Sequence, residues 1–222
     1  MTKIRMSDDD DEKEFENKII DVKPIGNLIT IYIVGEIGRP DNYTGCIEAI
    51  RHAGENDIIK ININSYGGDL FTTIQFMRAI AETRAIVVAS AEGACMSAAT
   101  MLFLSADRFE ISEHCLFMFH NYSGGTFGKG GEMYDQLVNE RKWSEKIIRK
   151  VYENFLNEGE IRSILENKDI WMDGEEVLER IKKKVEVENE KAEKEETKPQ
   201  DNEKPVRKTN ARKSTTPKQP KE

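Results

Sequence analysis

One serine in this chain stands where a hydroxyl group can act as a nucleophile. Ser97 follows a predicted strand and turn, and it opens an apolar helix predicted over 97–105. The positive end of a helix favours the negative charge that develops when a hydroxyl attacks a carbonyl, and the N–H of Ala98 can bind that oxyanion. Serine is also a common N-cap residue, and taken alone this pattern favours a cap.

A hydroxyl nucleophile needs a base, and His120 is the best placed of the three histidines. It follows a short predicted strand, 116–119, and precedes a glycine-rich segment. Imidazole is the side chain that exchanges a proton near neutral pH. His52 follows a helix and His114 lies in a predicted turn, so neither extends from a buried strand.

An acid is then needed to hold the imidazole in the right tautomer. Asp169 is a candidate because the apolar residues 170–172 follow it and would partly bury its carboxylate. The chain has 41 acidic residues, so the residue types alone leave this choice open.

Two glycines, Gly67 and Gly68, follow a predicted strand directly. For an isolated Gly-Gly pair, a tight turn is the simpler interpretation. The alternative is a backbone whose N–H approaches a reacting carbonyl closely, which requires that no Cβ stands in the way.

Alternating strands and helices must position these residues. β-Branched or alternating runs predict strands at 29–35, 58–64, 85–89, 108–111 and 116–119, while helical spacing predicts helices at 41–53, 69–82, 97–105, 132–157, 159–166 and 174–183. Parallel neighbours need crossover connections. The repeated βαβ units therefore predict an α/β fold with a largely parallel sheet and outer helices.

The helix predicted over 132–157 is long and amphipathic. Its core stripe is Met133, Leu137, Ile147, Ile148 and Val151, and it is expected to expose Tyr134, Trp143, Tyr152 and Phe155 as well. So much apolar surface suggests a partner interface. Ordinary packing within the domain explains the same pattern equally well.

The two ends of the chain differ from its middle. Residues 1–18 include a run of acidic residues, and residues 185–222 are mostly charged or polar. Neither segment can bury enough apolar surface to offset chain entropy, so both are predicted to be disordered. One folded domain over 19–184 remains.

The composition excludes several classes of function. A formal charge of −8 argues against a nucleic-acid binder. The three cysteines show neither a disulfide pattern nor metal-ligand spacing, so we expect free thiols in a reducing cytoplasm and no metal site. The N-terminal stretch resembles no signal peptide, and no apolar run is long enough to cross a membrane.

Four segments together resemble the proteolytic subunit of Clp protease, ClpP. Asn64–Gly68 resembles the family's N-S-P-G-G with Tyr66 in place of proline; Gly93–Ala98 resembles G-Q-A-A-S-M; Met118–Asn121, followed by Gly124 and Gly125, resembles M-I-H-Q-P with a later G-G; and Asp169–Asp173 resembles D-x-F-[LM]-[ST]. The resemblance covers residues 29–183, and the order and gaps match.

The resemblance implies the ClpP/crotonase fold and a Ser-His-Asp serine endopeptidase. Ser97, His120 and Asp169 would be catalytic; Gly68 and Ala98 would form the oxyanion hole; Gly67, Gly124 and Gly125 would bind substrate. It also implies a homo-oligomer of two stacked heptameric rings around a chamber that takes peptides or unfolded proteins. The segment 122–131 would be a strand that lines substrate and pairs the rings, and the helix at 132–157 would join them. The chemistry needs no cofactor, and ATP is consumed by a separate unfoldase.

Two departures from the family leave alternatives open. The family's N-terminal segment, which engages the unfoldase, is not recognisable here, and the polar tail is unusual. An inactive or structural ring subunit is one alternative. A crotonase-type acyl-CoA enzyme is another, although it should carry paired glutamates near the site, and Glu92 alone is weak support for it.

Overall fold

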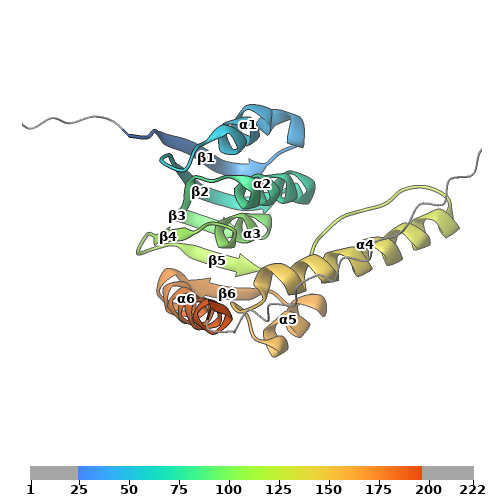
Figure 1. Ribbon diagram of the computed structural model, residues 1–222. Helices are drawn as coiled ribbons and strands as arrows, with labels where there is room; N and C mark the ends of the chain where they lie inside the picture. The colour runs from blue at the N-terminus through green and yellow to red at the C-terminus, as the bar shows by residue number, and fades with distance from the viewer. Residues whose placement is uncertain (1–24, 197–222) are drawn as a thin grey trace, which may run out of the picture.

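The computed structural model describes residues 25–196, with side-chain surroundings up to residue 186. The predicted acidic segment 1–18 lies outside the described residues, as does the last part of the predicted tail, 197–222. The predicted α/β fold is confirmed, because a mostly parallel sheet with flanking helices carries the described chain (Figure 1).

Within residues 25–196, six strands form the sheet. They are β1 (Leu28–Ile37), β2 (Ile58–Gly68), β3 (Ile86–Met96), β4 (Arg108–Ile111), β5 (Leu116–Phe119) and β6 (Ile170–Asp173). Their order is β1-β2-β3-β5-β6, and β4 also pairs with β3. Every pair is parallel except β5 with β6, which is antiparallel. The sequence analysis does not predict β6, although β4 and β5 are equally short.

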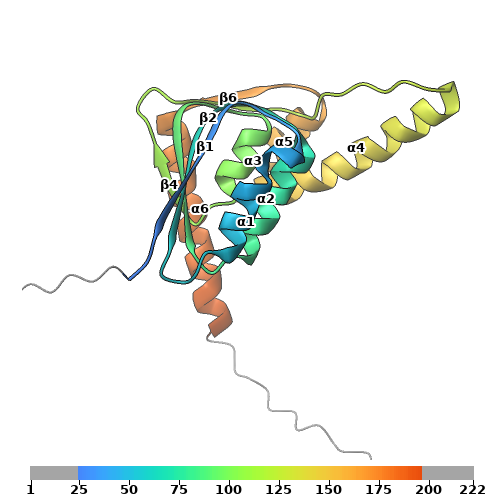
Figure 2. The ribbon, with the colours of Figure 1, turned by 90° about the horizontal axis from the view of Figure 1, so that it is seen from above.

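Three helices cover one face of the sheet (Figure 2). They are α1 (Thr44–His52), which a 3-10 turn at Pro40–Tyr43 precedes, α2 (Leu70–Glu82) and α3 (Ala98–Leu104). Ile59, Ile61 and Ile63 of β2 have no exposed surface and form the centre of the core. Successive side chains of a strand point to opposite faces, which explains why Lys60 between them is partly exposed.

The strands β2 and β3 run further than predicted. The interpretation of Gly67 and Gly68 as a tight turn and the turn predicted before Ser97 are wrong, since β2 continues to Gly68 and β3 to Met96. The register of β2 shifts between Ile63 and Ser65, an irregularity that accommodates the longer strands. These extensions bring Gly67 and Gly68 to the edge of the sheet where β3 ends and α3 begins.

The helix predicted at 132–157 ends five residues earlier than expected, and the one predicted at 159–166 is confirmed to within one residue at each end. The first, α4 (Gly130–Tyr152), ends where Asn154 takes a φ of 65°, a left-handed conformation that stops a helix. The second, α5 (Glu158–Leu165), begins at a capping box formed by Asn157 and Glu160. The N-terminal half of α4 projects beyond the body of the molecule (Figures 1 and 2).

The aromatic residues near the end of α4 are not the exposed surface that the sequence suggested. Tyr152 is fully buried and Phe155 nearly so, while Trp143 is partly buried and stacks on Phe71. Of the four aromatics, only Tyr134 is largely exposed. The end of α4 packs between α3, β5 and α5, and the helical spacing of apolar residues does not reveal such tertiary contacts. The sequence therefore predicted Tyr152 and Phe155 to be exposed, whereas both are buried.

Two further expectations need correction. The glycine-rich segment 122–129 forms no strand in the described structure, so it does not by itself extend the sheet. The last helix, α6 (Gly174–Glu196), passes through the predicted domain boundary at residue 184, so residues 185–196 are helical and not part of a disordered tail.

Candidate active site

Ser97 occupies the residue between β3 and α3, in an unusual backbone conformation. Its φ is 56° and its ψ is −130°, a region that costs L-residues on the order of 1–3 kcal/mol. Hydrogen bonds hold it there: its N–H donates to the Met118 carbonyl at 2.8 Å, and its carbonyl accepts from the Thr100 N–H at 2.9 Å. Its side chain makes no cap hydrogen bond with α3. The interpretation of Ser97 as a side-chain N-cap is therefore not supported.

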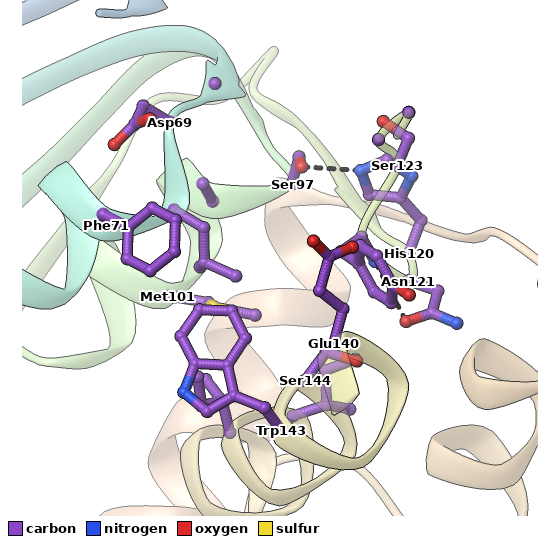
Figure 3. A pocket seen from close by; sticks show the side chains of 18 of the residues that line it. Asp69, Phe71, Ser97, Met101, His120, Asn121, Ser123, Glu140, Trp143 and Ser144 are labelled. Carbon is purple, nitrogen blue, oxygen red and sulfur yellow. Dashed lines mark hydrogen bonds between the residues drawn. The ribbon is translucent and has the colours of Figure 1, made fainter. Parts of the chain in front are cut away.

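The hydroxyl of Ser97 is hydrogen-bonded to His120 instead. The Oγ of Ser97 and the Nε2 of His120 lie 2.6 Å apart (Figure 3). Sheet pairing explains the meeting, since β3 and β5 are parallel neighbours with Met96 opposite Met118. The residues that follow each strand therefore emerge at the same edge, as the carboxyl ends of parallel strands do.

Asp169 immediately precedes β6 and His120 immediately follows β5, but the two side chains are not hydrogen-bonded. The antiparallel register pairs Phe119 with Ile170, which brings the next residues, His120 and Asp169, opposite one another. Asp169 is exposed, and among the described residues its carboxylate makes no hydrogen bond with the imidazole. The structure thus brings two of the three predicted catalytic residues into contact and the third only into the neighbouring position.

The glycine pair leaves room for the serine. A Cβ on Gly67, which has a φ of 95°, would lie 2.6 Å from the Cβ of Ser97 and 3.1 Å from the Ala98 nitrogen. A Cβ on Gly68 would lie 2.2 Å from the Ile37 carbonyl oxygen. Both positions exclude a side chain, and Gly67 does so because β2 passes directly against Ser97. The Gly67 N–H donates to Ser65 Oγ at 3.1 Å, so it already has a partner.

A pocket of about 480 Å³ opens beside Ser97 and His120. It lies between α2, α3, α4 and the glycine-rich segment, and Gly68, Ala98, Gly124 and Gly125 are among the residues that line it. Figure 3 shows Phe71, Met101 and Trp143 on an apolar side of this pocket, with Glu140 beside Trp143 on the side nearer His120. Of the predicted site residues, Gly67 and Asp169 do not line it.

Sequence reasoning missed a buried network behind Ser97. Thr100 Oγ1 donates to the Ser97 carbonyl at 2.7 Å and lies 2.8 Å from the hydroxyl of Tyr152. Thr100 and Tyr152 are fully buried. Burial raises the pKa of the Tyr152 hydroxyl, so this group stays neutral. The only sequence signal was a threonine one helical turn after Ser97, because the position of Tyr152 depends on how α4 packs.

Cys95 is excluded as a competing nucleophile. It precedes Ser97 by two residues, but its side chain is fully buried. Burial raises the pKa of its thiol well above the ordinary value. Because only the thiolate is an effective nucleophile, this thiol is inert.

Comparison with protein families gives a match to the Clp protease model over residues 30–180. That span is more than half of the 222-residue chain. The chain belongs to the Clp protease family. The mostly parallel sheet with flanking helices is consistent with membership in the Clp protease family. No curated protein matches the chain.

No group of three or more His, Cys, Asp or Glu side chains among the described residues is arranged to hold a metal ion. Within the same residues, no helix of this Clp protease family member is both long and apolar enough to cross a bilayer.

Proposed function

We propose that this Clp protease family member is a serine endopeptidase in which Ser97 is the nucleophile and His120 the general base. The observation that carries the proposal is the 2.6 Å hydrogen bond between Ser97 Oγ and His120 Nε2 at the edge of an open pocket. A base must lie within about 2.6–3.2 Å of the proton that it abstracts. The strained backbone of Ser97 gives further support, because such strain gathers at functional sites.

The proposed reaction has two stages. His120 takes the proton of Ser97 as Oγ attacks the peptide carbonyl, and the N–H groups of Gly68 and Ala98 bind the oxyanion. His120 then gives that proton to the departing amine, which leaves an acyl-enzyme that water hydrolyses. Ala98 supports this scheme because it is the first residue of α3, and the first N–H groups of a helix have no partner within it.

Asp169 completes the proposed triad by orienting the imidazole. Among the described residues, the Nδ1 of His120 has no hydrogen-bond partner, and the sheet register brings Asp169 to the adjacent position. A rotation of this exposed carboxylate toward Nδ1 would complete the triad. The absence of a hydrogen bond between the Asp169 carboxylate and His120 Nδ1 is also the one observation that favours a second candidate function, an inactive structural subunit.

We infer that the working form is a homo-oligomer of stacked rings that encloses peptides or unfolded proteins. The projecting half of α4 supports this inference, since it exposes Tyr134 and Leu137 far from the core. Folded proteins could reach such a chamber only through a separate ATP-driven unfoldase. Three unpaired cysteines fit a cytoplasmic setting.

Peptidase assays on an unfolded protein substrate test the function. Ser97→Ala should abolish cleavage and leave the melting temperature nearly unchanged, because only one oxygen atom is removed. Cleavage by Ser97→Ala at the rate of the native chain would refute the proposed nucleophile.

Cleavage by the native chain itself separates the active enzyme from the structural subunit, and Asp169→Asn then tests the role of Asp169. We expect a loss of about 10⁴-fold in kcat, because an amide holds the wrong tautomer of the imidazole. The matched control is Asp173→Asn at the other end of β6, where the carboxylate accepts the Glu176 N–H at 2.9 Å and where asparagine caps equally well. An Asp169→Asn variant as active as the control would remove Asp169 from the triad.

A further inference from the structure

In the part of the chain that the structure describes, Asp69 and Glu140 are the charged residues that line the pocket beside Ser97, and neither Lys nor Arg lines it. The Asp69 carboxylate caps α2 by accepting the Thr72 N–H at 2.7 Å, and Figure 3 shows it turned away from Ser97. Glu140 is therefore the carboxylate better placed to meet a substrate held at Ser97, with the oxygen that Gln136 does not occupy.

Hydrogen bonds fix the orientation of the Glu140 side chain. Its Oε1 accepts from Gln136 Nε2 at 2.7 Å, and Gln136 Oε1 accepts from Thr126 Oγ1 at 2.5 Å. This chain of contacts ties the glycine-rich segment to α4 and fixes one carboxylate oxygen. Figure 3 shows the carboxylate of Glu140 extending from α4 into the pocket, on the side where Ser97 and His120 lie.

The rest of the pocket suits a long aliphatic stem. Trp143 and Phe71 stack with ring centroids 5.2 Å apart, and Met101 and Ile147 also line the pocket. Lysine and arginine bury their methylene stems against apolar surface while their cationic heads reach a polar group. An aromatic ring beside such a cation adds further attraction.

We propose that Glu140 makes this pocket selective for a lysine or arginine side chain at the residue that precedes the scissile bond. The inference rests on the proposed function, since a specificity residue has meaning only if Ser97 attacks the adjacent carbonyl. In serine peptidases, a carboxylate in the pocket next to the nucleophile selects basic residues, and an uncharged apolar pocket selects apolar ones. Glu140 acts on substrate binding and takes no part in the proton transfers.

Two fluorogenic peptides that differ only in carrying lysine or methionine before the leaving group test the proposal on the full chain. The native protein should cleave the lysine peptide with the higher kcat/KM. Glu140→Gln keeps the size of the side chain and an oxygen that can accept from Gln136, so the fold should persist. Its kcat/KM for the lysine peptide should fall by about 10- to 100-fold, the value of a hydrogen bond to a charged group, with little change for the methionine peptide.

Two further variants complete the experiment. Glu140→Lys should reverse the preference, so that a glutamate peptide becomes better than the lysine peptide. Asp135→Asn removes one negative charge from the same helix outside the pocket, and it should leave the ratio of the two kcat/KM values unchanged.

The possible failures are distinguishable. Cleavage that disappears in Ser97→Ala but shows no preference for lysine, or a preference that survives in Glu140→Gln, overturns the role of Glu140 and leaves the peptidase intact. Absence of any cleavage that depends on Ser97, with either peptide, overturns the proposed function and this inference together.

Discussion

At the scale of single residues, the site depends on the space around Ser97. Its φ of 56° is neither that of a strand nor that of a helix, and its hydroxyl is hydrogen-bonded to His120 instead of capping α3. This conformation is possible because Gly67 passes alongside without a side chain. Strain at Ser97 and the absence of a Cβ at residue 67 are thus two parts of one arrangement.

Gly67→Ala tests that arrangement. The new methyl group would lie 2.6 Å from the Ser97 Cβ and 2.8 Å from the Met96 carbonyl oxygen, so Ser97 must shift. We expect a fall of about 10²-fold in kcat, the effect of a displacement of roughly 1 Å at a reacting group. The positive φ adds a stability loss of about 1–3 kcal/mol, measurable by urea unfolding.

Gly45→Ala is the matched control for this substitution. Gly45 lies within α1, and a Cβ there would have no atom within 4 Å. Alanine should stabilise the helix by about 0.5–1 kcal/mol and leave kcat unchanged. If Gly67→Ala behaved like Gly45→Ala, the close approach of β2 to Ser97 would have no functional importance.

The sequence predicts part of the site and misses the rest for a physical reason. Ser97 and His120 could be chosen because each follows a strand, and parallel strands end at one edge of a sheet. Glu140 and Tyr152 could not, since both lie on α4 and their surroundings depend on the angle at which that helix leaves the body. Asp169 was chosen by resemblance, and its neighbour across the sheet is set by β6, a strand that the sequence did not reveal.

At the scale of elements, the end of α4 supports the turn at Ser97. The Thr100 hydroxyl donates its proton to the Ser97 carbonyl, so in the contact between the two hydroxyls Tyr152 must be the donor. This places a side chain of α4 behind the residue that joins β3 to α3. The last turn of α4 is therefore a structural support of the site, whereas its first turns project away from it.

Tyr152→Phe measures that support. Removing the hydroxyl leaves Thr100 bonded to Ser97 but deprives the buried Thr100 oxygen of a donor. We expect the free energy of unfolding to fall by about 1–2 kcal/mol and kcat to fall less than in Gly67→Ala. The control is Tyr134→Phe, because Tyr134 is exposed on the projecting half of the same helix. Equal stability of the two variants would show that the buried contact contributes nothing.

The elements themselves were largely predictable. β4 and β5 match their predicted bounds, and β1, α1, α2 and α3 differ by only a few residues. The errors lie where tertiary contacts override local signals, as at Gly93, where β3 continues because β5 pairs with it at Ala94. The break between α4 and α5 has a local cause in Asn154 and Asn157, two asparagines that suit a left-handed residue and an N-cap.

At the scale of the whole molecule, the projecting half of α4 has little to pack against within one chain. Leu137 is 46% exposed there, although helical spacing places it on the predicted core stripe. An apolar stripe that continues beyond the body of a domain is suited to contact with another copy. The proposed ring assembly gives this stripe a partner.

Leu137→Glu tests the assembly. The native protein should elute as a large oligomer, and the variant should shift toward the mass of one chain, 25.4 kDa, because a buried unpaired carboxylate is costly. The control is Leu178→Glu on α6, at a leucine of similar exposure, 39%, which should leave the oligomer intact. Light scattering measures both masses. A native protein that runs as a single chain would contradict the assembly.

The most direct test of the central claim is labelling of the full-length protein with a fluorophosphonate, followed by peptide mapping. The reagent bonds covalently to a serine only where a base activates the hydroxyl. We predict one label per chain, on Ser97, lost in His120→Gln and absent in Ser97→Ala. Label that persists undiminished in Ser97→Ala, or no label on the native chain, would contradict the account.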